Sequence, residues 1–480
     1  MTLQRISALT AWPLHSVAST RMLESQALSG AESHSLMRRA AESVARLALA
    51  LAPHAQDIWV ACGPGNNGGD GLLAALWLQQ AGKRVHVTRW ADDKPAPADT
   101  LQALQSVQQA GLVIATDIPK SWDLAIDALL GLGARSAPSG RMGDALAALC
   151  ASPAPVLCVD VPTGLDADTG VWHGPAIHPA QTRHTLSLLT LKPGLFTRAG
   201  RDSAGTVWLD NLDIAASEQE ACAWLQGPTP LPRRWHDAHK GRFGDVAVVG
   251  GDVGMSGAAL LAGTAALHAG AGRVMVHLLA RSEGLASPAA LMLRPVDALS
   301  LGDNATVVAG CGGGDAIRVH LPRLLSKAAR LVLDADALNA IAQDQGLLHL
   351  LRQRAQRQLH TVLTPHPLEA ARLLDTSTSK VQDDRLASAQ ALATLTQSCV
   401  VLKGSGSVIA RAQGLPHINP TGNARLSTAG SGDVLAGMIG ARMAQGQTAW
   451  EAACGAVYAH GQRAEEGPQD SVLTADMLAC

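Results

Sequence analysis

Short apolar runs recur along the whole chain, and each is followed by a glycine-rich turn and then by a stretch whose apolar residues have helical spacing. This alternation constrains the fold most, because strands that alternate with helices are joined by crossover connections. It predicts an α/β fold with parallel sheets covered by helices on both faces. The candidate strands are residues 57–62, 84–90, 112–116, 124–130, 156–161 and 184–191 in the first half, and 244–251, 273–280, 305–314, 330–338, 361–367 and 400–410 in the second.

The best domain boundary lies around residues 216–236, where the prolines of SEQEACAWLQGPTPLPRRWHD interrupt this alternation. The chain has 480 residues, and at about 150 residues per domain two or three domains are expected. The two halves do not align as repeats of each other. We therefore expect two unrelated α/β domains, residues 1–220 and 230–480.

Composition excludes several classes of protein. Lys and Arg total 38 against 40 Asp and Glu, and the one basic cluster, RQRAQRQ (352–358), is interpreted as a solvated helix face, so no nucleic-acid partner is expected. No apolar run approaches the ~20 residues of a membrane span, and the first 20 residues lack the apolar core of a signal peptide. We expect a soluble, cytoplasmic protein without a membrane partner.

The eight cysteines form no C-x-x-C pair, and several lie inside apolar runs. Their spacing is typical of neither a disulfide framework nor a zinc site. We expect them to be small buried hydrophobic residues.

Residues 63–71, GPGNNGGDG, lie between a candidate strand and a helical stretch, and their first glycines match G-x-G-x-x-G. This pattern brings backbone amides close to a pyrophosphate, but a glycine-rich tight turn explains it equally simply. In a dinucleotide-binding domain an acidic residue about 20 positions further on contacts the ribose, and Asp92 is a candidate. Asn66, Asn67 and Asp70 add polar side chains that a plain pyrophosphate turn does not need.

Two further strand ends carry oxygen-bearing side chains. Asp127 ends one in IDALLGLG, and Asp160 and Thr163 follow another in VDVPTGLDADTG. Together with the glycine turn, these residues could form a hard-cation site or an acid/base site. Each acid taken alone is equally well explained as a helix cap or turn residue.

These motifs, with LTLKPGL, resemble the YjeF N-terminal domain of the NAD(P)H-hydrate epimerase family over roughly residues 15–215. The resemblance implies a Rossmann-like three-layer domain, a potassium ion held by Asn67, Asp127 and Thr163, and Asp160 as the proton-transfer group at the reacting ring. One departure is Leu132, where the family usually has Thr. The residues implied to bind the hydrated dinucleotide are Asn66, Asn67, Gly68, Gly69, Asp70, Gly131, Leu132, Gly133, Ala134, Arg135, Ser136, Ala137 and Asp160.

The second half contains STAGSGDVLAGMIGA (427–441), in which Asp433 begins a helical stretch. Free amides at a helix N-terminus bind anions, and a carboxylate beside them could accept a proton during phosphoryl transfer. Lys403, in KGSGSVIA, could contact nucleotide phosphates. An N-cap aspartate and, for His366 in TPHP, a surface-turn histidine are the structural alternatives.

Segments including HKGRFGDVAVVGG, LDADALNA, LTPHPLEAARLL and NPTGNARLSTAGSGDVLAG resemble the ADP-dependent NAD(P)H-hydrate dehydratase, a ribokinase-like fold, over about residues 235–480. The resemblance implies Mg²⁺ and ADP, which phosphorylates the 6-hydroxyl of the S hydrate before phosphate leaves. GCGGG (310–314), where the family often has G-P-G-L-G, and Ala424-Arg425, where Pro-Gly is frequent, depart from the pattern. Lys403, Gly404, Ser405, Gly406, Ser407 and Gly432 would bind the nucleotide, and Ala259, Gly312, His366 and Asp433 the hydrate, with Asp433 as base.

The sequence therefore predicts a bifunctional enzyme that epimerises R and S NADHX and NADPHX and dehydrates the S form with ADP, and a homo-oligomeric state is expected. The alternative is a ribokinase-type small-molecule kinase fused to a non-catalytic dinucleotide-binding domain. These hypotheses differ in their products, since repair returns NAD(P)H, AMP and phosphate.

Overall fold

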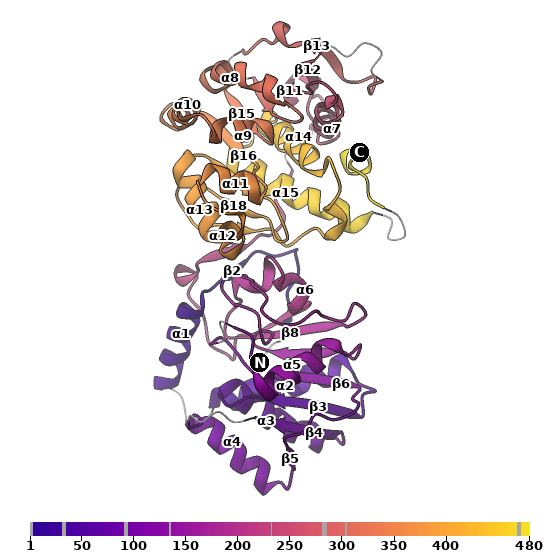
Figure 1. Ribbon diagram of the computed structural model, residues 1–480, viewed down its shortest axis with the longest axis vertical. Coiled ribbons are helices and arrows are strands. Elements are labelled where there is room, and N and C mark those ends of the chain that lie inside the picture. The colour runs from indigo at the N-terminus through magenta and orange to yellow at the C-terminus, as the bar shows by residue number, and fades with distance from the viewer. Residues whose placement is uncertain are drawn as a thin grey trace. The chain divides into compact units, whose positions relative to one another are not determined.

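The computed structural model describes residues 3–30, 35–90, 95–133, 136–231, 233–280, 286–302, 305–467 and 472–480 (Figure 1). Its internal contacts divide the chain into two compact units. The first comprises residues 1–7 and 12–223, and the second comprises residues 8–11 and 224–480. The main division thus falls between residues 223 and 224.

The first unit is built on an eight-stranded sheet with the order β1-β9-β8-β7-β6-β3-β4-β5. All neighbouring strands are parallel except β1 and β9. The strands are β1 (Gln4–Arg5), β3 (Asp57–Cys62), β4 (Arg84–Arg89), β5 (Ile114–Ala115), β6 (Leu124–Ala128), β7 (Val156–Val159), β8 (Arg183–Leu188) and β9 (Thr206–Asp210), and the short β2 (Trp12–Leu14) precedes the first helix.

Helices cover both faces of this sheet and complete three layers (Figure 1). Apolar residues of α2, α3 and α4 form the core on one face, and those of α5 form the core on the other. In α2 the buried residues recur every three or four positions, which explains why this sequence forms a helix with one buried face. The helices are α1 (Val17–Gly30), α2 (Ser35–Leu51), α3 (Asn66–Gln80), α4 (Ala98–Gln109), α5 (Gly140–Ala151) and α6 (Gly200–Ala204).

The second unit has a sheet with the order β13-β12-β11-β14-β15-β16-β17-β18-β19-β10. Its strands are parallel from β13 to β17, whereas β18 runs antiparallel to β17 and to β19. The strands are β10 (Ala223–Leu225), β11 (Asp245–Gly250), β12 (Arg273–Leu278), β13 (Met292–Pro295), β14 (Thr306–Ala309), β15 (Arg330–Leu333), β16 (His360–Leu363), β17 (Cys399–Leu402), β18 (Val408–Ala410) and β19 (His417–Ile418).

Helices on the two faces of this sheet belong to two separate apolar cores. Residues of α7, α14, α15 and α16 form one core, and residues of α8 to α13 form the other. The helices are α7 (Ser256–His268), α8 (Leu321–Lys327), α9 (Asp336–Ala342), α10 (Gln345–Gln356), α11 (Pro367–Leu373), α12 (Thr378–Asp383), α13 (Arg385–Thr396), α14 (Ser431–Ala444), α15 (Ala449–Glu466) and α16 (Ala475–Ala479).

Glycines hold α14 close to its neighbours. A Cβ on Gly437 would lie 2.0 Å from the carbonyl oxygen of Ala262 in α7, and one on Gly440 would lie 2.5 Å from Val308 in β14. Larger residues at these positions would push α14 away from the sheet. The close packing sets the position of the N-terminus of α14 at the carboxyl edge of the strands.

The expected α/β architecture is correct, but several local predictions are wrong. The sheets are not wholly parallel, because β1 and β18 run antiparallel to their neighbours. Residues 400–410 form two strands rather than one, since the chain reverses at Gly404 and Gly406, both with positive φ. Residues 330–338 contain a strand only to Leu333, after which α9 begins.

Arg354 contradicts the expected solvated face of residues 352–358. Its side chain is buried, and its Nη1 donates to the carbonyl oxygens of Leu325 and Ala328 at 2.9 and 2.8 Å. Five donors on one planar group allow an arginine to satisfy several carbonyls at once. Arg354, which belongs to α10, therefore stabilises the C-terminal end of α8 by binding its carbonyl oxygens.

The glycine turn of the first unit is shorter than expected, because α3 begins at Asn66 and already contains the NNGGDG residues. A Cβ on Gly68 would lie 2.1 Å from the carbonyl oxygen of Gly63, and one on Gly71 would lie 2.6 Å from Ala128 of β6. These glycines thus let the helix pack directly on the strand-to-helix turn and on the sheet. Close packing alone therefore explains why two positions of the motif are glycine, whether or not a ligand binds there.

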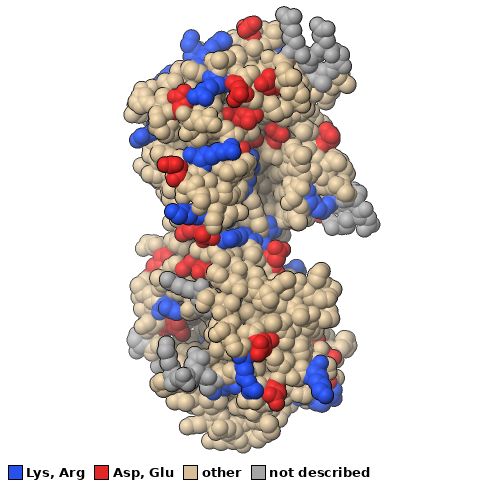
Figure 2. Space-filling view, in the orientation of Figure 1, with Lys and Arg blue, Asp and Glu red and all other residues tan. Residues whose placement is uncertain are grey.

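Surface charge is mixed on the face shown in Figure 2, where acidic and basic side chains are interspersed on each unit. All eight cysteines are free, and six of them are buried, as their spacing predicted; Cys222 is partly exposed and Cys480 is exposed. Within the described ranges, no helix combines the length and the apolar character that crossing a membrane requires.

Candidate active sites

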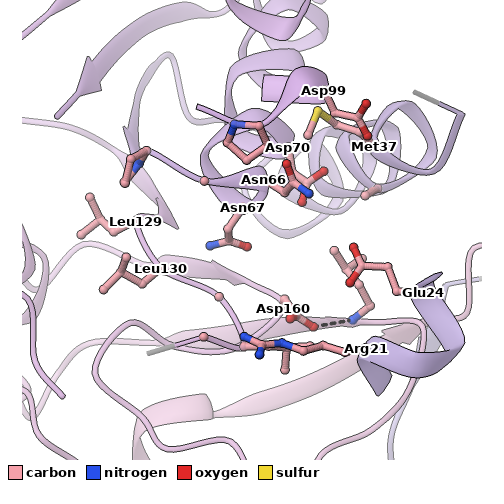
Figure 3. Close-up of a pocket in the computed structure, with 18 of the residues that line it drawn as sticks. Arg21, Glu24, Met37, Asn66, Asn67, Asp70, Asp99, Leu129, Leu130 and Asp160 are labelled. Carbon is pink, nitrogen blue, oxygen red and sulfur yellow. Dashed lines mark hydrogen bonds between the residues drawn. The ribbon is translucent and has the colours of Figure 1, made fainter. Parts of the chain in front are cut away.

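A cavity of about 860 Å³ opens at the carboxyl edge of the first sheet (Figure 3). Its wall includes the beginning of α3, the loop after β6 and the end of β7. The predicted residues that line it are Asn66, Asn67, Asp70, Gly131, Leu132, Gly133, Ser136, Ala137 and Asp160.

Some predicted residues of this site lie elsewhere. Gly68 and Gly69 do not line the cavity, and Gly69 instead leaves room for Met37, whose Cε would lie 2.5 Å from an added Cβ. Asp92, Ala134 and Arg135 lie outside the described residues.

Helix α1 contributes residues that the sequence patterns did not reveal. Arg21 and Glu24 line the cavity and lie across it from Asn67 (Figure 3). Met37 of α2 and Asp99 of α4 also line the cavity. Their helices carry no recognisable motif, so only the folded chain brings them to this site.

Asp160 has a strained backbone and an ion-paired side chain directly after β7. Its φ of 66° is rare for a residue with a side chain, and such strain often marks functional sites. Its Oδ1 accepts from Lys192 Nζ at 2.5 Å and from the amide of Leu188 at 3.1 Å. The buried Lys192 side chain therefore fixes the position of this carboxyl group.

Lys192 was not among the predicted site residues, although LTLKPGL contains it. Its side chain is fully buried, and its Nζ also donates to the carbonyl oxygen of Leu188 at 2.8 Å and to Ser187 Oγ at 3.3 Å. A buried lysine needs such partners. A lone lysine among apolar residues, directly after the candidate strand 184–191, was the signal that could have identified it.

Other carboxyl groups in the cavity have altered acidity. Burial raises the pKa of Asp70 well above its ordinary value, and the carboxylates of Asp160 and Glu24 raise it further. Burial also raises the pKa of Glu24, again helped by Asp160. The cavity thus combines an ion-paired carboxylate with acids that retain their protons more readily, an arrangement typical of acid/base chemistry.

Asp127 and Thr163 meet beneath this cavity, as the strand-end argument predicted. The Thr163 hydroxyl donates to Asp127 Oδ1 at 2.7 Å, and its amide donates to Oδ2 at 2.9 Å. Thr163 Oγ1 also accepts from the amide of Leu130 at 3.0 Å. The Asn67 side chain packs against Gly131, the residue after Leu130, since a Cβ on Gly131 would be 3.4 Å from Asn67 Oδ1.

The amide group of Asn67 is itself unsatisfied. Both its Oδ1 and Nδ2 are buried and form no hydrogen bond in the described structure. Buried polar atoms of this kind are rare and call for a partner. The oxygens of Asn67, Asp127 and Thr163 are hard donors, so the group fits an alkali or alkaline-earth cation better than zinc.

In the second unit, Asp433 lies in the first turn of α14. The N-cap is Gly430, so the alternative of an N-cap aspartate is wrong. In a helix the first amides, including those of Gly432 and Asp433, have no intrahelical acceptor. Burial raises the pKa of Asp433 to about 6, and the neighbouring Asp334 carboxylate contributes. A carboxyl group that titrates near neutral pH suits a general base.

Lys403 lies beside this carboxylate cluster. Its Nζ donates to Asp334 Oδ1 at 2.7 Å, and Thr364 Oγ1 donates to the same oxygen at 2.8 Å. A Cβ on Gly432 would lie only 3.1 Å from Lys403 Nζ. The fold thus brings together two of the predicted nucleotide-binding residues, Lys403 directly after β17 and Gly432 at the start of α14.

The Gly404–Ser407 turn follows Lys403 and joins β17 to β18. Gly404 has a φ of 144°, and a Cβ there would lie 2.8 Å from Arg385 Nη1. Ser407 Oγ donates to the carbonyl oxygen of Gly404 at 3.1 Å. Glycine is required here because backbone and arginine approach closely.

His366 is the N-cap of α11, which agrees with the turn interpretation. Its Nδ1 accepts from the amide of Leu368 at 3.1 Å, so Nε2 carries the proton and faces Glu369 Oε1 at 3.2 Å. Burial raises the pKa of Glu369 to about 7. Lys403 lies close enough to lower the pKa of His366, although burial is the larger cause.

Gly312 and Ala259 complete the predicted set. A Cβ on Gly312 would lie 2.6 Å from the carbonyl oxygen of Met255, just before α7. Ala259 is buried in the first part of α7. Both belong to the segments that surround the N-terminus of α14.

Cys311, Asp334 and Asp433 place their ligand atoms within 4.8 Å of one another. Two features argue against a resident metal ion. Burial raises the pKa of the Cys311 thiol well above its ordinary value, and Lys403 already neutralises Asp334. Lys403 and Thr364 thus form a hydrogen-bonded network around Asp334, with Asp433 and Cys311 beside it.

Fold and sites together define a two-unit α/β enzyme in which each unit has a buried carboxylate at the carboxyl edge of a largely parallel sheet. The protein-family model of the YjeF-related protein N-terminus matches residues 33–194, and the family model of NAD(P)H-hydrate dehydratase matches residues 246–480. The bifunctional NAD(P)H-hydrate repair enzyme of Escherichia coli K12 is 35% identical over 459 residues, covering 90% of this chain and 85% of its own. The corresponding enzyme of Coxiella burnetii is 34% identical over 475 residues, covering 94% of both chains.

The chain belongs to the family of bifunctional NAD(P)H-hydrate repair enzymes. The predicted family and the two-part α/β fold are thereby confirmed. Among solved structures, an ADP/ATP-dependent NAD(P)H-hydrate dehydratase from Bacillus subtilis is 27% identical, with a TM-score of 0.43, and covers 52% of this chain and 91% of its own. A ribokinase-like superfamily protein from Enterococcus faecalis is 25% identical, with a TM-score of 0.44, over 52% of this chain and 88% of its own.

Proposed function

We propose that the first unit interconverts the R and S forms of NADHX and NADPHX and that the second dehydrates the S form at the expense of ADP. The family assignment supports an enzyme with both activities. The structural observation that carries the division of labour is that Asp160 and Asp433 lie in different units, each at its own strand edge.

For the epimerase, Asp160 is the proton acceptor. When the 6-hydroxyl gives its proton to Asp160, the C6–N1 bond can break to leave an aldehyde at C6, and N1 takes up a proton. Asp70 lines the same cavity, and its raised pKa suits it to supply that proton. Closure on the other face reverses these transfers and inverts C6. The remaining lining residues, with the amides of the glycine turn, would bind the dinucleotide.

A potassium ion would be held by Asn67, Asp127 and Thr163. The unsatisfied amide of Asn67 and the hydroxyl and carboxylate oxygens beneath it support this assignment. When bound, the ion would supply positive charge near the phosphates and the loop after β6. Asn67 and Thr163 would then fix the distance between α3 and that loop.

We expect KCl to stabilise the protein more than choline chloride does at equal ionic strength. A ligand at 100 times its Kd stabilises the folded state by about 2.7 kcal/mol. The Asn67→Ala variant should lose most of this difference, which thermal unfolding in the two salts would measure. Equal melting temperatures of the wild-type protein in both salts would contradict the potassium site.

For the dehydratase, Asp433 accepts the proton of the 6-hydroxyl as that oxygen attacks the β-phosphoryl group of ADP. The free amides at the start of α14 and Lys403 stabilise the charge on the phosphoryl oxygens. AMP leaves, phosphate then departs from C6, and loss of a proton from C5 yields NAD(P)H. The residues Lys403 to Ser407 and Gly432 would hold the nucleotide, and Ala259, Gly312 and His366 would contact the hydrate.

Mg²⁺ would accompany ADP. It is commonly held by substrate phosphates and water with few protein ligands, so it requires no dedicated cage in this chain. When bound, it would neutralise charge on the transferring phosphoryl group.

The test is to incubate the full chain with mixed R and S hydrates, ADP and Mg²⁺ and to follow NAD(P)H absorbance, AMP and phosphate. We expect complete recovery of NAD(P)H with ADP and R/S exchange without it. A stable phosphorylated product would favour the small-molecule kinase instead. If NAD(P)H formation stops once the S hydrate is consumed and the R hydrate remains, the first unit only binds the dinucleotide and does not epimerise it.

We further propose a homo-oligomer acting in the cytoplasm. The eight free cysteines are compatible with a reducing compartment. Light scattering of the purified chain would measure the oligomeric state.

A further inference from the structure

The wall of the first cavity is mostly acidic, although the hydrated dinucleotide is an anion. Among the described residues that line this cavity, Arg21 is the only lysine or arginine. The acidic residues in the same lining are Glu24, Asp70, Asp99 and Asp160. Lys192 is close by, but it is fully buried and its charge is paired with Asp160. Because like charges repel, Arg21 is the side chain that can offset the charge of a bound pyrophosphate.

The first turn of α1 fixes the position of Arg21. The amide of Val17 donates to Asp168 Oδ1 at 2.8 Å, in the segment between β7 and β8. The hydroxyls of Thr20 and Thr190 share a buried hydrogen bond of 2.7 Å, directly after β8. Arg21 is the next residue along the helix. Its backbone is therefore held against the carboxyl edge of the first sheet.

The guanidinium of Arg21 reaches the loop after β6. A Cβ on Gly133 would lie 3.1 Å from Arg21 Nη2, so a larger residue at Gly133 would displace the arginine. The Arg21 side chain is exposed and forms no hydrogen bond or ion pair with any residue that the structure describes. A guanidinium of this kind can bind a phosphate through two parallel hydrogen bonds.

Arg21 lies at the end of the cavity that contains Asp160, the proposed proton acceptor at the nicotinamide ring. Figure 3 shows both side chains on the same side of the cavity, across from Asn67. Both also act on Glu24, since burial raises the pKa of Glu24 most, Asp160 raises it further and Arg21 lowers it. The substrate phosphate nearest to the ring is the 5′-phosphate on the nicotinamide side. The 2′-phosphate of NADPHX is at the opposite end of the molecule, on the adenosine.

We propose that Arg21 binds the nicotinamide-side phosphate of the hydrated dinucleotide, between α1 and the loop that contains Gly133. This inference rests on the proposed epimerase function of the first unit. Arg21 contacts the phosphate before and after ring opening, so it contributes to substrate binding and not to the proton transfers. It acts equally on NADHX and NADPHX, because both carry this phosphate.

The test is the kinetics of R/S exchange without ADP, followed by chromatography, in the Arg21→Met variant of the full chain. The KM values for NADHX and NADPHX should rise alike by about 10-fold, the low end for a charge-assisted hydrogen bond because the site is open to solvent. The kcat should stay near the wild-type value, as expected for a contact made equally throughout the reaction. Arg21→Lys should recover part of the affinity, since lysine keeps the charge without the planar pair of donors.

The salt dependence separates a phosphate contact from a structural role. With KCl held constant, added choline chloride should raise the KM of the wild-type protein, because salt screens exposed charges. The KM of Arg21→Met should rise less. Arg46→Met is the matched control, since Arg46 is an exposed arginine of α2 that does not line the cavity. Its KM and its salt dependence should equal those of the wild-type protein.

Reduced nicotinamide mononucleotide carries only the nicotinamide-side phosphate, so it tests which phosphate Arg21 binds. It should inhibit exchange competitively in the wild-type protein and about 10-fold more weakly in Arg21→Met. Three results would overturn the inference: a rise in KM confined to NADPHX, a mononucleotide that fails to inhibit the wild-type protein or inhibits both proteins equally, and a loss of kcat at unchanged KM.

The wild-type measurement separates this inference from the proposed function. If the wild-type protein does not exchange the R and S hydrates, the epimerase assignment fails, and the role of Arg21 fails with it. If the wild-type protein exchanges them and Arg21→Met has an unchanged KM for both hydrates, only the Arg21 inference fails.

Discussion

Asp433→Asn should lower dehydratase turnover by a factor on the order of 10² to 10⁴, the usual contribution of a general base. Asparagine keeps the shape of the side chain but cannot accept the proton of the attacking hydroxyl. ADP affinity should change little, because the amides at the start of α14 and Lys403 remain. NAD(P)H recovery from the S hydrate and calorimetry with ADP measure the two quantities on one purified variant.

Asp344→Asn is the matched control for this variant. Asp344 is the partly exposed N-cap of α10, and its Oδ1 accepts from the amides of Gly346 and Leu347. The same chemical change at another helix start should leave turnover unaltered. If Asp433→Asn recovers NAD(P)H at a normal rate, Asp433 has no part in proton transfer, and loss of ADP binding as well would indicate misfolding.

Asp160→Asn should reduce R/S exchange by a factor on the order of 10² to 10⁴ while dehydration of the pure S hydrate continues. The carboxylate is the proton acceptor in the proposed ring opening, and it lies in the other unit from Asp433. With mixed hydrates and ADP, NAD(P)H should form only from the S fraction, apart from spontaneous interconversion. Chromatography of the hydrates without ADP measures exchange directly.

This variant also leaves Lys192 buried without its counter-ion, and removing one partner of a buried ion pair costs about 3–5 kcal/mol. The double variant Asp160→Asn with Lys192→Met removes both charges and should recover much of the melting temperature without recovering exchange. Asp123→Asn, at an exposed carboxylate that accepts from two backbone amides, is the control for the chemical change alone. Exchange at the wild-type rate in a stable Asp160→Asn protein would exclude Asp160 as the proton acceptor.

Several features of this protein follow from local sequence. Apolar runs such as 57–62 become strands because their residues can be buried on both faces of a sheet. Glycine-rich turns and oxygen-bearing side chains at strand ends could be identified because parallel strands bring their carboxyl ends to one edge. For this reason Asp127 and Thr163 were expected near each other, and they are in contact.

Local sequence patterns were less informative where the same residues are compatible with two different structural roles. The NNGGDG glycines match a phosphate-binding motif, yet Gly68 and Gly71 are required for packing against Gly63 and Ala128. The run 400–410 has the composition of one strand, but positive φ values at two glycines make it a hairpin. Backbone conformation depends on tertiary contacts that composition does not specify.

The sequence by itself determined the α/β class and the acids at the strand ends, because these depend on periodicity and on short motifs. Only the tertiary structure decided which buried charges face one another. Lys192 pairs with Asp160 and Lys403 with Asp334 across many intervening residues, and Arg21 and Glu24 enter the first cavity from a helix without any motif. The energy of a buried charge depends on its partners within a few ångströms, and those neighbours are set by packing.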